Sequence, residues 1–352
     1  MRVHGLAPGL NYGQQALEGF KAFRMADKSK GICLFRPDRN ALRFQHSAEM
    51  LSMPCVPVEM FLRACRAAVV LNAEFVPPHE SGGALYIRPL LYGSSAQLPP
   101  GAANEYTFSV FVAPLPDLRG VETSGTKAAL ILDDFDRAAP RGIGHAKAGG
   151  NYAGVLRWSD KAKAEGFGLT LHLDSARHQE VDEFSTCAFI GVISSDNDSD
   201  DVTLVSPSSP CAIDSVTSDS LQHIARSFGW KVEKRPVAYT ELPSFSEVLG
   251  AGTGDGLTPV RSITRRCAHS SASTAAVKSH ASNSSRLQID SDTEIVRYIP
   301  DEQYSGGPVY RKLLAQLRAI QVGKAADDFG WCHVVREKDQ ELENGNEPQT
   351  VA

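Results

Sequence analysis

Segments with helical and with strand-like apolar spacing alternate along this chain, and this alternation limits its possible folds more than any other feature. Residues 41–51 and 58–75 repeat apolar positions every three or four residues, which predicts amphipathic helices. Residues 83–93 and 105–115 are rich in β-branched and aromatic residues, which predicts strands. Because both kinds of segment occur in both halves, we expect an α/β or α+β protein.

The second half of the chain repeats this alternation. A Gly-rich stretch that starts at residue 142 leads into a helix, which we expect to begin near Tyr152. The other predicted elements are strands at 127–135, 167–174 and 184–193, and a segment at 203–208 that leads through a turn into a helix at 215–229. An extended segment follows at 231–242, and a short helix, a Gly-rich loop and a strand lie within 243–263.

The length of 352 residues is enough for two domains. A polar loop at 116–126 lies between the two halves, so we predict a small domain at 1–116, an interdomain loop at 117–123 and a large domain at 124–352. Residues 264–286 are rich in Ser and Ala, which predicts a low-complexity surface insertion without chemistry.

Composition excludes several classes of protein. The 36 basic and 41 acidic residues give a net charge of −5, which argues against a nucleic-acid partner. No apolar run reaches the ~18 residues of a membrane span. The seven cysteines are widely spaced without a CxxC motif, and the ten histidines do not cluster with them, so we expect neither a disulfide framework nor a metal site. An intracellular protein is expected, cytoplasmic rather than mitochondrial.

One lysine lies in a setting that suits covalent chemistry. Lys147 is followed by Ala148, Gly149 and Gly150 in the stretch HAKAGGNY, and these small residues leave room for a bulky group against the backbone. A lysine that forms a Schiff base needs a pKa lowered by desolvation or by nearby cations. Taken alone, the motif is more typical of an ordinary surface lysine beside a glycine turn.

Other segments offer groups that would hold an anionic aromatic ligand. Glu183 precedes an apolar strand, where its carboxylate could pair with a pyridinium nitrogen. The predicted helix start at 215–221 has Ser and Thr at its cap, and the N–H groups of a helix start bind anions. The loop 250–256 adds the hydroxyl of Thr253, and Arg88 within an apolar strand needs an anionic partner. A solvated turn acid, plain helix capping and a flexible turn are the ordinary alternatives.

The order of these residues decides between the alternatives. Arg88, Lys147, Tyr152, Glu183, the pair 216–217 and Thr253 follow one another as they do in the branched-chain aminotransferases, which are fold-type IV enzymes that use pyridoxal 5'-phosphate (PLP), and the chain resembles this family. The resemblance runs from about Leu10 to Trp331 and looks strongest to fungal members, some of which serve specialised-metabolite pathways. It is carried by NYGQQALEGFKAFR, FRPDRN, YIRPLL, KAGGNYAG, EFSTCAFIGV, GTGDGLTPV and DDFGW.

The resemblance implies a role for each matching residue. Lys147 would form the Schiff base with PLP and move the proton in catalysis. Tyr152 would bond the phenolate oxygen of the cofactor, and Glu183 its pyridine nitrogen. The phosphate cup would consist of Arg88, Thr253 and the backbone amides of Val216 and Thr217. The substrate pocket would include Tyr12, Leu17, Gly254 and Asp255.

Two of these pocket residues differ from those usual in the family. Asp255 stands where a small or neutral residue is usual, near the expected place of the substrate carboxylate. A like charge there would weaken carboxylate binding, unless Asp255 points away or recognises another substrate. Leu17 replaces an aromatic residue, which would reshape the side-chain pocket.

The resemblance implies a two-domain fold-type IV architecture, with an N-terminally short small domain, and a homodimer. The implied reaction is PLP-dependent transfer of the amino group between a branched-chain or similarly bulky apolar L-amino acid and 2-oxoglutarate. A D-amino acid or amine aminotransferase and an aminodeoxychorismate lyase-like enzyme are alternatives within the same fold, although GGNY and EFST favour the first function. A third alternative is a homologue that keeps the fold without activity.

Overall fold

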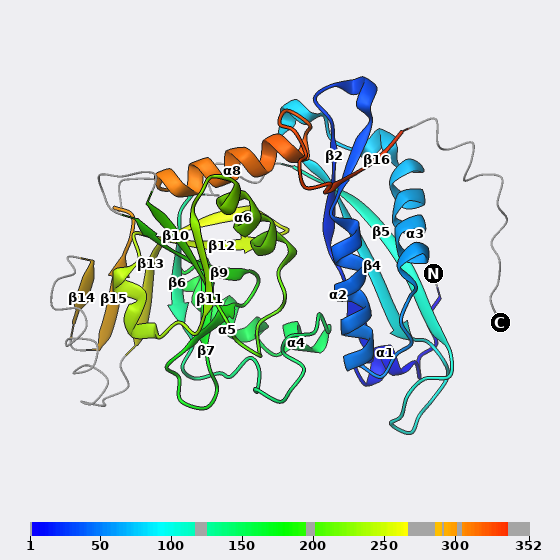
Figure 1. The fold of residues 1–352 in the computed structure, drawn as a ribbon. Helices are drawn as coiled ribbons and strands as arrows, with labels where there is room; N and C mark the ends of the chain where they lie inside the picture. Colours follow the sequence, from blue (N-terminus) through cyan, green and yellow to red (C-terminus); the bar gives the residue numbers. More distant parts are fainter. Residues whose placement is uncertain are drawn as a thin grey trace. The chain divides into compact units, whose positions relative to one another are not determined.

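The computed structural model describes residues 2–116, 125–194, 201–266, 286–290, 292–300 and 305–336. The chain divides into two compact units (Figure 1). Unit 1 comprises residues 1–120, 146–149 and 318–352, and unit 2 comprises residues 121–145 and 150–317. Unit 1 therefore draws on three separate stretches of the sequence.

An antiparallel sheet forms the frame of unit 1. The long strand β4 (Ala84–Gly93) pairs along its whole length with β5 (Tyr106–Leu115). β1 (Gln15–Leu17) and β2 (Phe20–Arg24) pair with different halves of β4, so they follow one another along its other edge. β2 continues the sheet to β3 (Ile32–Phe35), which pairs with β16 (Cys332–Val335).

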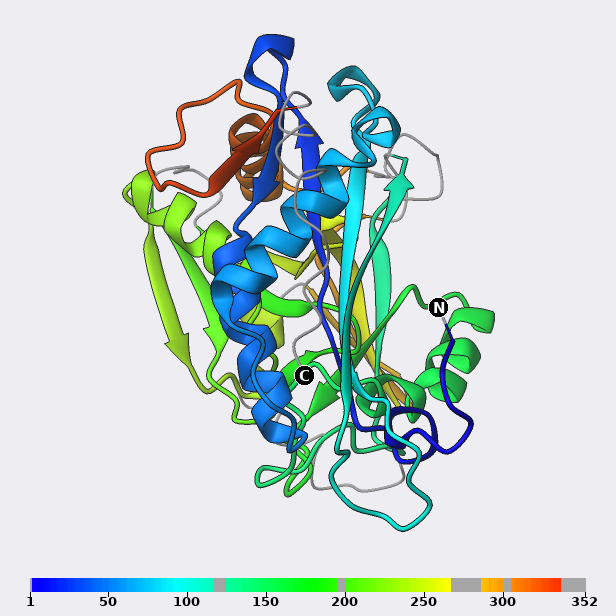
Figure 2. The ribbon, with the colours of Figure 1, turned by 90° about the vertical axis from the view of Figure 1, so that its right-hand side faces the viewer.

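Two helices cover one face of this sheet (Figure 2). In α2 (Pro37–Met50), Pro37 occupies the first turn and Asp38 lies near the positive end of the helix dipole. α3 (Val58–Val70) presents Phe61, Cys65 and Val69 to the core. The short helices of unit 1 are α1 (Pro8–Asn11), η1 (Lys28–Lys30), η2 (Ala73–Phe75) and η3 (His79–Ser81).

Aromatic rings fill the space between the helices and the sheet. Phe44 and Phe61 are fully buried, with ring centroids 5.4 Å apart, and Phe20 stacks on Phe61 at 6.1 Å. Burial of one such side chain contributes about 1.5–3 kcal/mol relative to leaving it exposed. This core fixes the orientation of β1 and β2, which carry the unit 1 part of the candidate site.

A larger mixed sheet forms unit 2, with the strand order β11-β10-β9-β12-β13-β6-β7-β8 among the described residues. β6 pairs in parallel with β13 and β7, and β10 with β11, whereas the other pairs on this path are antiparallel. Strand β15 extends from β13, and β14 pairs with β15. The bounds are β6 (Lys127–Ile131), β7 (Leu169–Leu173), β8 (Val181–Phe184), β9 (Ala188–Ser194), β10 (Val202–Pro207), β11 (Lys231–Arg235), β12 (Glu247–Gly252), β13 (Gly256–Arg266), β14 (Leu287–Ile289) and β15 (Thr293–Arg297).

The helices of unit 2 begin where side chains satisfy their first N–H groups. Ser215 caps α6 (Val216–Ser227) by accepting the N–H of Ser218, and Gly229, with φ of +80°, follows its end. The buried Glu247 carboxylate accepts the N–H groups of residues 309 and 310 at the start of α8 (Pro308–Gln321). The other helices are α4 (Gly150–Ala153), α5 (Leu156–Ala164), which packs on β7, and η5 (Tyr239–Ser244).

The mixed α/β class predicted from the sequence is confirmed, but two details differ. The short helix expected within 243–263 is wrong beyond Ser244, because residues 247–252 form β12 between β9 and β13. The predicted large domain extended to residue 352, whereas β16 completes the sheet of unit 1. The expected loop at 117–123 and most of the expected insertion at 264–286 lie outside the described residues, although β13 continues to Arg266.

Candidate active site

The segment 146–149 runs beside β1. An isolated bridge joins Ala16 to Ala148, and the carbonyl of Lys147 accepts the N–H of Leu17 at 3.0 Å. The N–H of Lys147 donates to the hydroxyl of Ser47 on α2 at 2.9 Å. The backbone of Lys147 is therefore fixed on both sides, while its side chain is only half-buried.

Arg88 is held close to this segment, within unit 1. Its Nε donates to the carbonyl of Glu18 at 2.8 Å and its Nη2 to the hydroxyl of Tyr86 at 2.9 Å. Gly19 makes this arrangement possible, because a Cβ there would overlap the Tyr86 hydroxyl. Two polar contacts thus orient the guanidinium of Arg88.

A buried ion pair anchors the chain between β1 and β2, two strands that follow one another along the same edge of β4. The fully buried Glu18 carboxylate binds Arg43 of α2 through two contacts, from Nε at 2.6 Å and from Nη2 at 2.8 Å. The N–H of Gly19 donates to Glu18 as well, at 2.9 Å. No local pattern singles out either partner in the sequence, because they are separated by 25 positions.

The predicted substrate-pocket residues of unit 1 lie at β1 and just before it. Leu17 ends β1 beside the Lys147 segment and is half-buried. Tyr12 caps the C-terminus of α1, and its hydroxyl bonds the carbonyl of Leu98. Its side chain is largely exposed.

In unit 2 the predicted Glu183 is buried against a cation. Its Oε1 lies 2.7 Å from Nη2 of Arg137, and it also accepts the N–H of Ile213 at 3.2 Å. Arg137 is held in turn by the carbonyl of Cys211 at 2.5 Å and that of Gly144 at 3.3 Å. The sequence analysis missed Arg137, which lies in a polar loop without any local pattern.

The start of α6 and the end of β12 are joined within unit 2. The Ser215 hydroxyl, which caps the helix, also lies 3.4 Å from the carbonyl of Ala251. This contact brings the turn that carries Thr253 beside Val216 and Thr217, the first residues of α6. The first N–H groups of a helix have no acceptor within the helix, so this corner suits an anion. The three predicted unit 2 members of the phosphate cup thus belong to one corner.

Asp255 is paired with a lysine. Its Oδ2 lies 2.7 Å from Nζ of Lys127 at the start of β6 and accepts the hydroxyl of Thr258 at 3.2 Å. Both side chains of the ion pair are 28% exposed. The unbalanced negative charge expected from the sequence is therefore offset by Lys127.

A histidine lies directly across the β7–β8 ladder from Glu183. His172 is 1% exposed, and its Nε2 lies 2.6 Å from the hydroxyl of Ser185, which is 2.5 Å from that of Thr170. Burial, and secondarily the charge of Arg137, lowers the pKa of His172 to about 3. His172 is neutral at physiological pH, and the sequence analysis did not single it out.

The predicted site residues form one group on each unit. Arg88, Lys147, Tyr12 and Leu17 belong to unit 1. Glu183, Val216, Thr217, Thr253, Gly254 and Asp255 belong to unit 2, as does Tyr152 in α4. A hydrogen bond from Asn151 Nδ2 to the carbonyl of Ile143, at 2.9 Å, fixes the turn that presents Tyr152.

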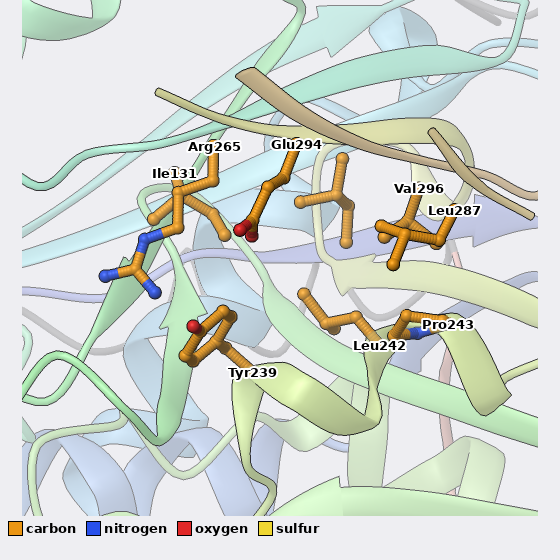
Figure 3. A pocket seen from close by; sticks show the side chains of 9 residues that line it. Ile131, Tyr239, Leu242, Pro243, Arg265, Leu287, Glu294 and Val296 are labelled. Atoms are coloured by element: carbon orange, nitrogen blue, oxygen red, sulfur yellow. The ribbon is translucent and has the colours of Figure 1, made fainter. Parts of the chain in front are cut away.

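A separate pocket of unit 2 contains none of the predicted site residues (Figure 3). Leu242, Pro243, Leu287 and Val296 gather on one side, with Tyr239 and Arg265 on the other. Arg265 is already committed to a two-point ion pair with Asp133, at 2.8 and 2.9 Å. We assign this pocket to the packing of β13–β15 on η5.

No group of three or more potential metal ligands occurs within the part of the chain that the structure describes. Among those same residues, no helix is both long and apolar enough to cross a membrane.

Comparison with known families decides the class of this protein. The family model for amino-transferase class IV matches residues 19–263, which is more than half of the chain. The chain is a class IV aminotransferase.

This aminotransferase has curated fungal relatives over nearly its whole length. It is 47% identical over 337 residues to aminotransferase poxL of Penicillium oxalicum, covering 96% of this chain and 83% of the relative. It is 45% identical over 333 residues to the branched-chain amino acid aminotransferase gloG of Glarea lozoyensis, covering 95% and 85%. The resemblance inferred from the sequence is confirmed.

Solved structures share the fold of this class IV aminotransferase. The branched-chain amino acid aminotransferase of Escherichia coli superposes with a TM-score of 0.71 at 23% identity, covering 94% of this chain and 93% of that one. The branched-chain amino acid aminotransferase of Thermobaculum terrenum in its PLP form gives a TM-score of 0.69 at 20% identity, covering 94% and 92%. The fold-type IV architecture is therefore confirmed.

Class IV aminotransferases use PLP, and the side chains of this aminotransferase fit that group. A buried carboxylate, Glu183, suits a protonated pyridine nitrogen, and the α6 start beside Thr253 suits a phosphate. Lys147 supplies a primary amine on a fixed backbone.

Proposed function

We propose that this aminotransferase binds PLP and transfers the amino group of a branched-chain or similarly bulky apolar L-amino acid to 2-oxoglutarate. The observation that carries the proposal is the buried Glu183 carboxylate, which accepts the N–H of Ile213 just before the start of α6. A buried carboxylate suits a cationic ring nitrogen. The name of the relative gloG supports the substrate class.

Seven residues would hold the cofactor. Lys147 would bind it covalently through Nζ, Glu183 would meet its ring nitrogen, and Tyr152 its phenolate oxygen. Its phosphate would be held by Arg88, Thr253 and the backbone amides of Val216 and Thr217. When bound, PLP supplies an electron sink that stabilises negative charge at the substrate Cα.

The residues of this chain supply orientation and proton transfer. Nζ of Lys147 would act as the base that takes the proton from the substrate Cα and as the acid that returns it. The two backbone hydrogen bonds of Lys147 fix the position of its Cα, from which the side chain extends. Glu183 would keep the ring nitrogen protonated by pairing with it.

The substrate carboxylate would dock near Gly254 and Asp255. Lys127 makes this docking possible, because its ammonium lies 2.7 Å from the Asp255 carboxylate and offsets its charge. The apolar Leu17, where the family usually has an aromatic residue, would widen the room for the substrate side chain. These contacts favour a bulky apolar substrate with a free α-carboxylate.

The decisive experiment is an absorbance titration of the purified protein with PLP, before and after addition of L-leucine, followed by detection of glutamate after addition of 2-oxoglutarate. We expect a band that depends on Lys147 and shifts with L-leucine but not with D-leucine. Lys147→Ala should abolish the band and lower turnover by about a thousandfold. Lys163→Ala on α5, whose side chain is exposed, is the matched control.

Each other result would change the proposal. A Lys147-dependent band that ignores L-leucine but responds to D-leucine or to an amine would replace the substrate class by one of the alternatives within the fold. Absence of any Lys147-dependent band would refute PLP binding at this site.

A further inference from the structure

Two buried polar atoms beside Glu183 have complementary hydrogen-bonding needs. Nε of Arg137 and Nδ1 of His172 are both inaccessible to solvent and have no hydrogen-bond partner among the described residues. The other two nitrogens of Arg137 are bound to the Glu183 carboxylate and to the carbonyls of Cys211 and Gly144. A buried donor and a buried acceptor left without partners are rare in native proteins.

A neutral His172 that carries its proton on Nε2 presents Nδ1 as an acceptor. Burial lowers its pKa to about 3, so the ring is neutral and carries one proton. If Nε2 donates to the Ser185 hydroxyl, and Ser185 donates to Thr170, the proton resides on Nε2 and the Nδ1 lone pair is available. A lone pair is what the N–H of a guanidinium requires.

Arg137 and His172 are neighbours in the fold. Nη2 of Arg137 lies 2.7 Å from the Glu183 carboxylate, and the charge of Arg137 contributes, after burial, to the lowered pKa of His172. Phe135, two positions before Arg137, packs edge-on against the His172 ring with centroids 6.3 Å apart. His172 is also the cross-strand partner of Glu183, so their side chains leave the sheet on the same face.

Binding of a protonated ring nitrogen to Glu183 would disturb this arrangement. The Glu183 carboxylate would then interact with the new cation, and its interaction with Arg137 would weaken. Arg137, with a side chain only 4% exposed, would then lose part of its compensation in a dry environment. Another acceptor within reach would offset that loss.

We propose that His172 is a positioning residue that receives Arg137 when Glu183 pairs with the ring nitrogen of the cofactor. In this arrangement Nε–H of Arg137 donates to Nδ1 of His172, and Ser185 with Thr170 holds the imidazole in the required tautomer. The inference rests on the proposed function, because it needs PLP at Glu183. It predicts that His172 acts on cofactor binding through Arg137, without touching the cofactor.

Two substitutions separate the two ring nitrogens. The amide of His172→Asn can place an oxygen near the position of Nδ1, whereas the longer His172→Gln reaches the position of Nε2 and Ser185. We expect His172→Gln to weaken PLP binding by about tenfold and His172→Asn by about twofold. We also expect the ¹⁵N signal of Nδ1 in the wild-type protein to shift on addition of PLP, which a purely structural histidine would not show.

A cofactor analogue gives an independent control. 1-Deazapyridoxal 5'-phosphate has carbon in place of the ring nitrogen, so it cannot draw Glu183 away from Arg137. Its affinity should be equal for the wild type and both His172 variants.

The outcomes separate the two proposals. Lack of a Lys147-dependent band with PLP in the wild type overturns the proposed function and the inference with it. A normal band combined with equal PLP affinities of wild type and His172→Gln, or with an unmoved Nδ1 signal, overturns the inference alone. If His172→Gln fails to fold, the response of the Nδ1 signal of the wild type to PLP still decides.

Discussion

A buried glutamate–arginine pair lies in each unit, and the two pairs differ in how their arginine side chains are bonded. In unit 1, Glu18 and Arg43 meet through two short contacts, and Arg43 also donates to Asn40 at 3.1 Å. In unit 2, Oε1 of Glu183 lies 2.7 Å from Nη2 of Arg137, and Nε of Arg137 has no partner among the described residues. Both pairs are almost inaccessible to solvent.

This difference separates a structural ion pair from one that we assign to function. A two-point arginine–carboxylate contact fixes the geometry of both side chains and joins α2 to the interrupted strand β1–β2. An arginine with an unpartnered donor can rearrange around a ligand at a lower free-energy cost. Burial alone therefore does not identify an active-site carboxylate, whereas the state of its partner does.

The largest effect is expected from breaking the structural pair. Glu18→Gln leaves the Arg43 guanidinium buried without its counter-charge, which should lower the free energy of unfolding by about 3–5 kcal/mol. Urea denaturation of the apo protein measures this loss. Glu74→Gln, at an exposed position of η2, is the control and should change it by less than about 0.5 kcal/mol. Equal stability of the two variants would remove the structural role of Glu18.

Breaking the second pair should affect turnover more than folding. Glu183→Gln cannot balance a protonated ring nitrogen, so we expect kcat to fall by about 100-fold while the apo protein loses less stability than Glu18→Gln. Asp182→Asn is the matched control, since Asp182 is also buried in β8 but bonds Ser209 instead. Comparable kcat values for the two variants would contradict the role of Glu183.

The burial of His172, which lies beside the Glu183–Arg137 pair, should make the stability of the protein depend on pH. The folded pKa of His172 is lowered from 6.5 to about 3, so the unfolded chain binds more protons between these values. Its contribution is present above pH 6.5 and is lost as pH falls, by about 1.4 kcal/mol per pH unit at the steepest. Between pH 6 and pH 4, the free energy of unfolding, measured by urea denaturation, should therefore fall less steeply with pH in His172→Gln than in the wild type. Parallel curves would show that His172 titrates normally.

A third ion pair, which is partly exposed, should give the smallest effect. Lys127→Met leaves Asp255 unbalanced near the expected substrate carboxylate, and solvent screens part of that charge, so we expect KM for the amino acid to rise about fivefold. The double variant Lys127→Met/Asp255→Asn should restore KM. If KM of the double variant stays raised, Lys127 contributes through something other than the charge of Asp255.

Local patterns in the sequence predicted much of the fold. The helices predicted at 41–51 and 58–75 correspond to α2 and α3, although α3 ends at Val70. The aromatic and β-branched runs correspond to β4 and β5. These elements carry their information within a few neighbouring residues. β12 was misread because its glycines give no strand pattern, yet a Cβ at Gly250 would come within 2.8 Å of Cys187 Sγ. Its glycines are required by packing, which only the fold reveals.

The candidate site was predicted in part. Lys147 and Glu183 stand in recognisable motifs, so resemblance to a family singled them out as candidates. Their partners could not be found in this way: Asp255 and Lys127 are separated by 128 positions, and Arg137 lies in an irregular loop. Which charges meet depends on strand order in the folded sheet, and single-sequence patterns do not encode that order.

The pairing of β16 with β3 sets the order in which this protein can be completed on the ribosome. The small sheet lacks its last strand until residues 332–335 have emerged, after all of unit 2 has been synthesised. Until then β3 is an open edge, able to pair with another nascent chain. Premature termination just before residue 332 would thus leave every site residue in place and yet yield a product prone to aggregation.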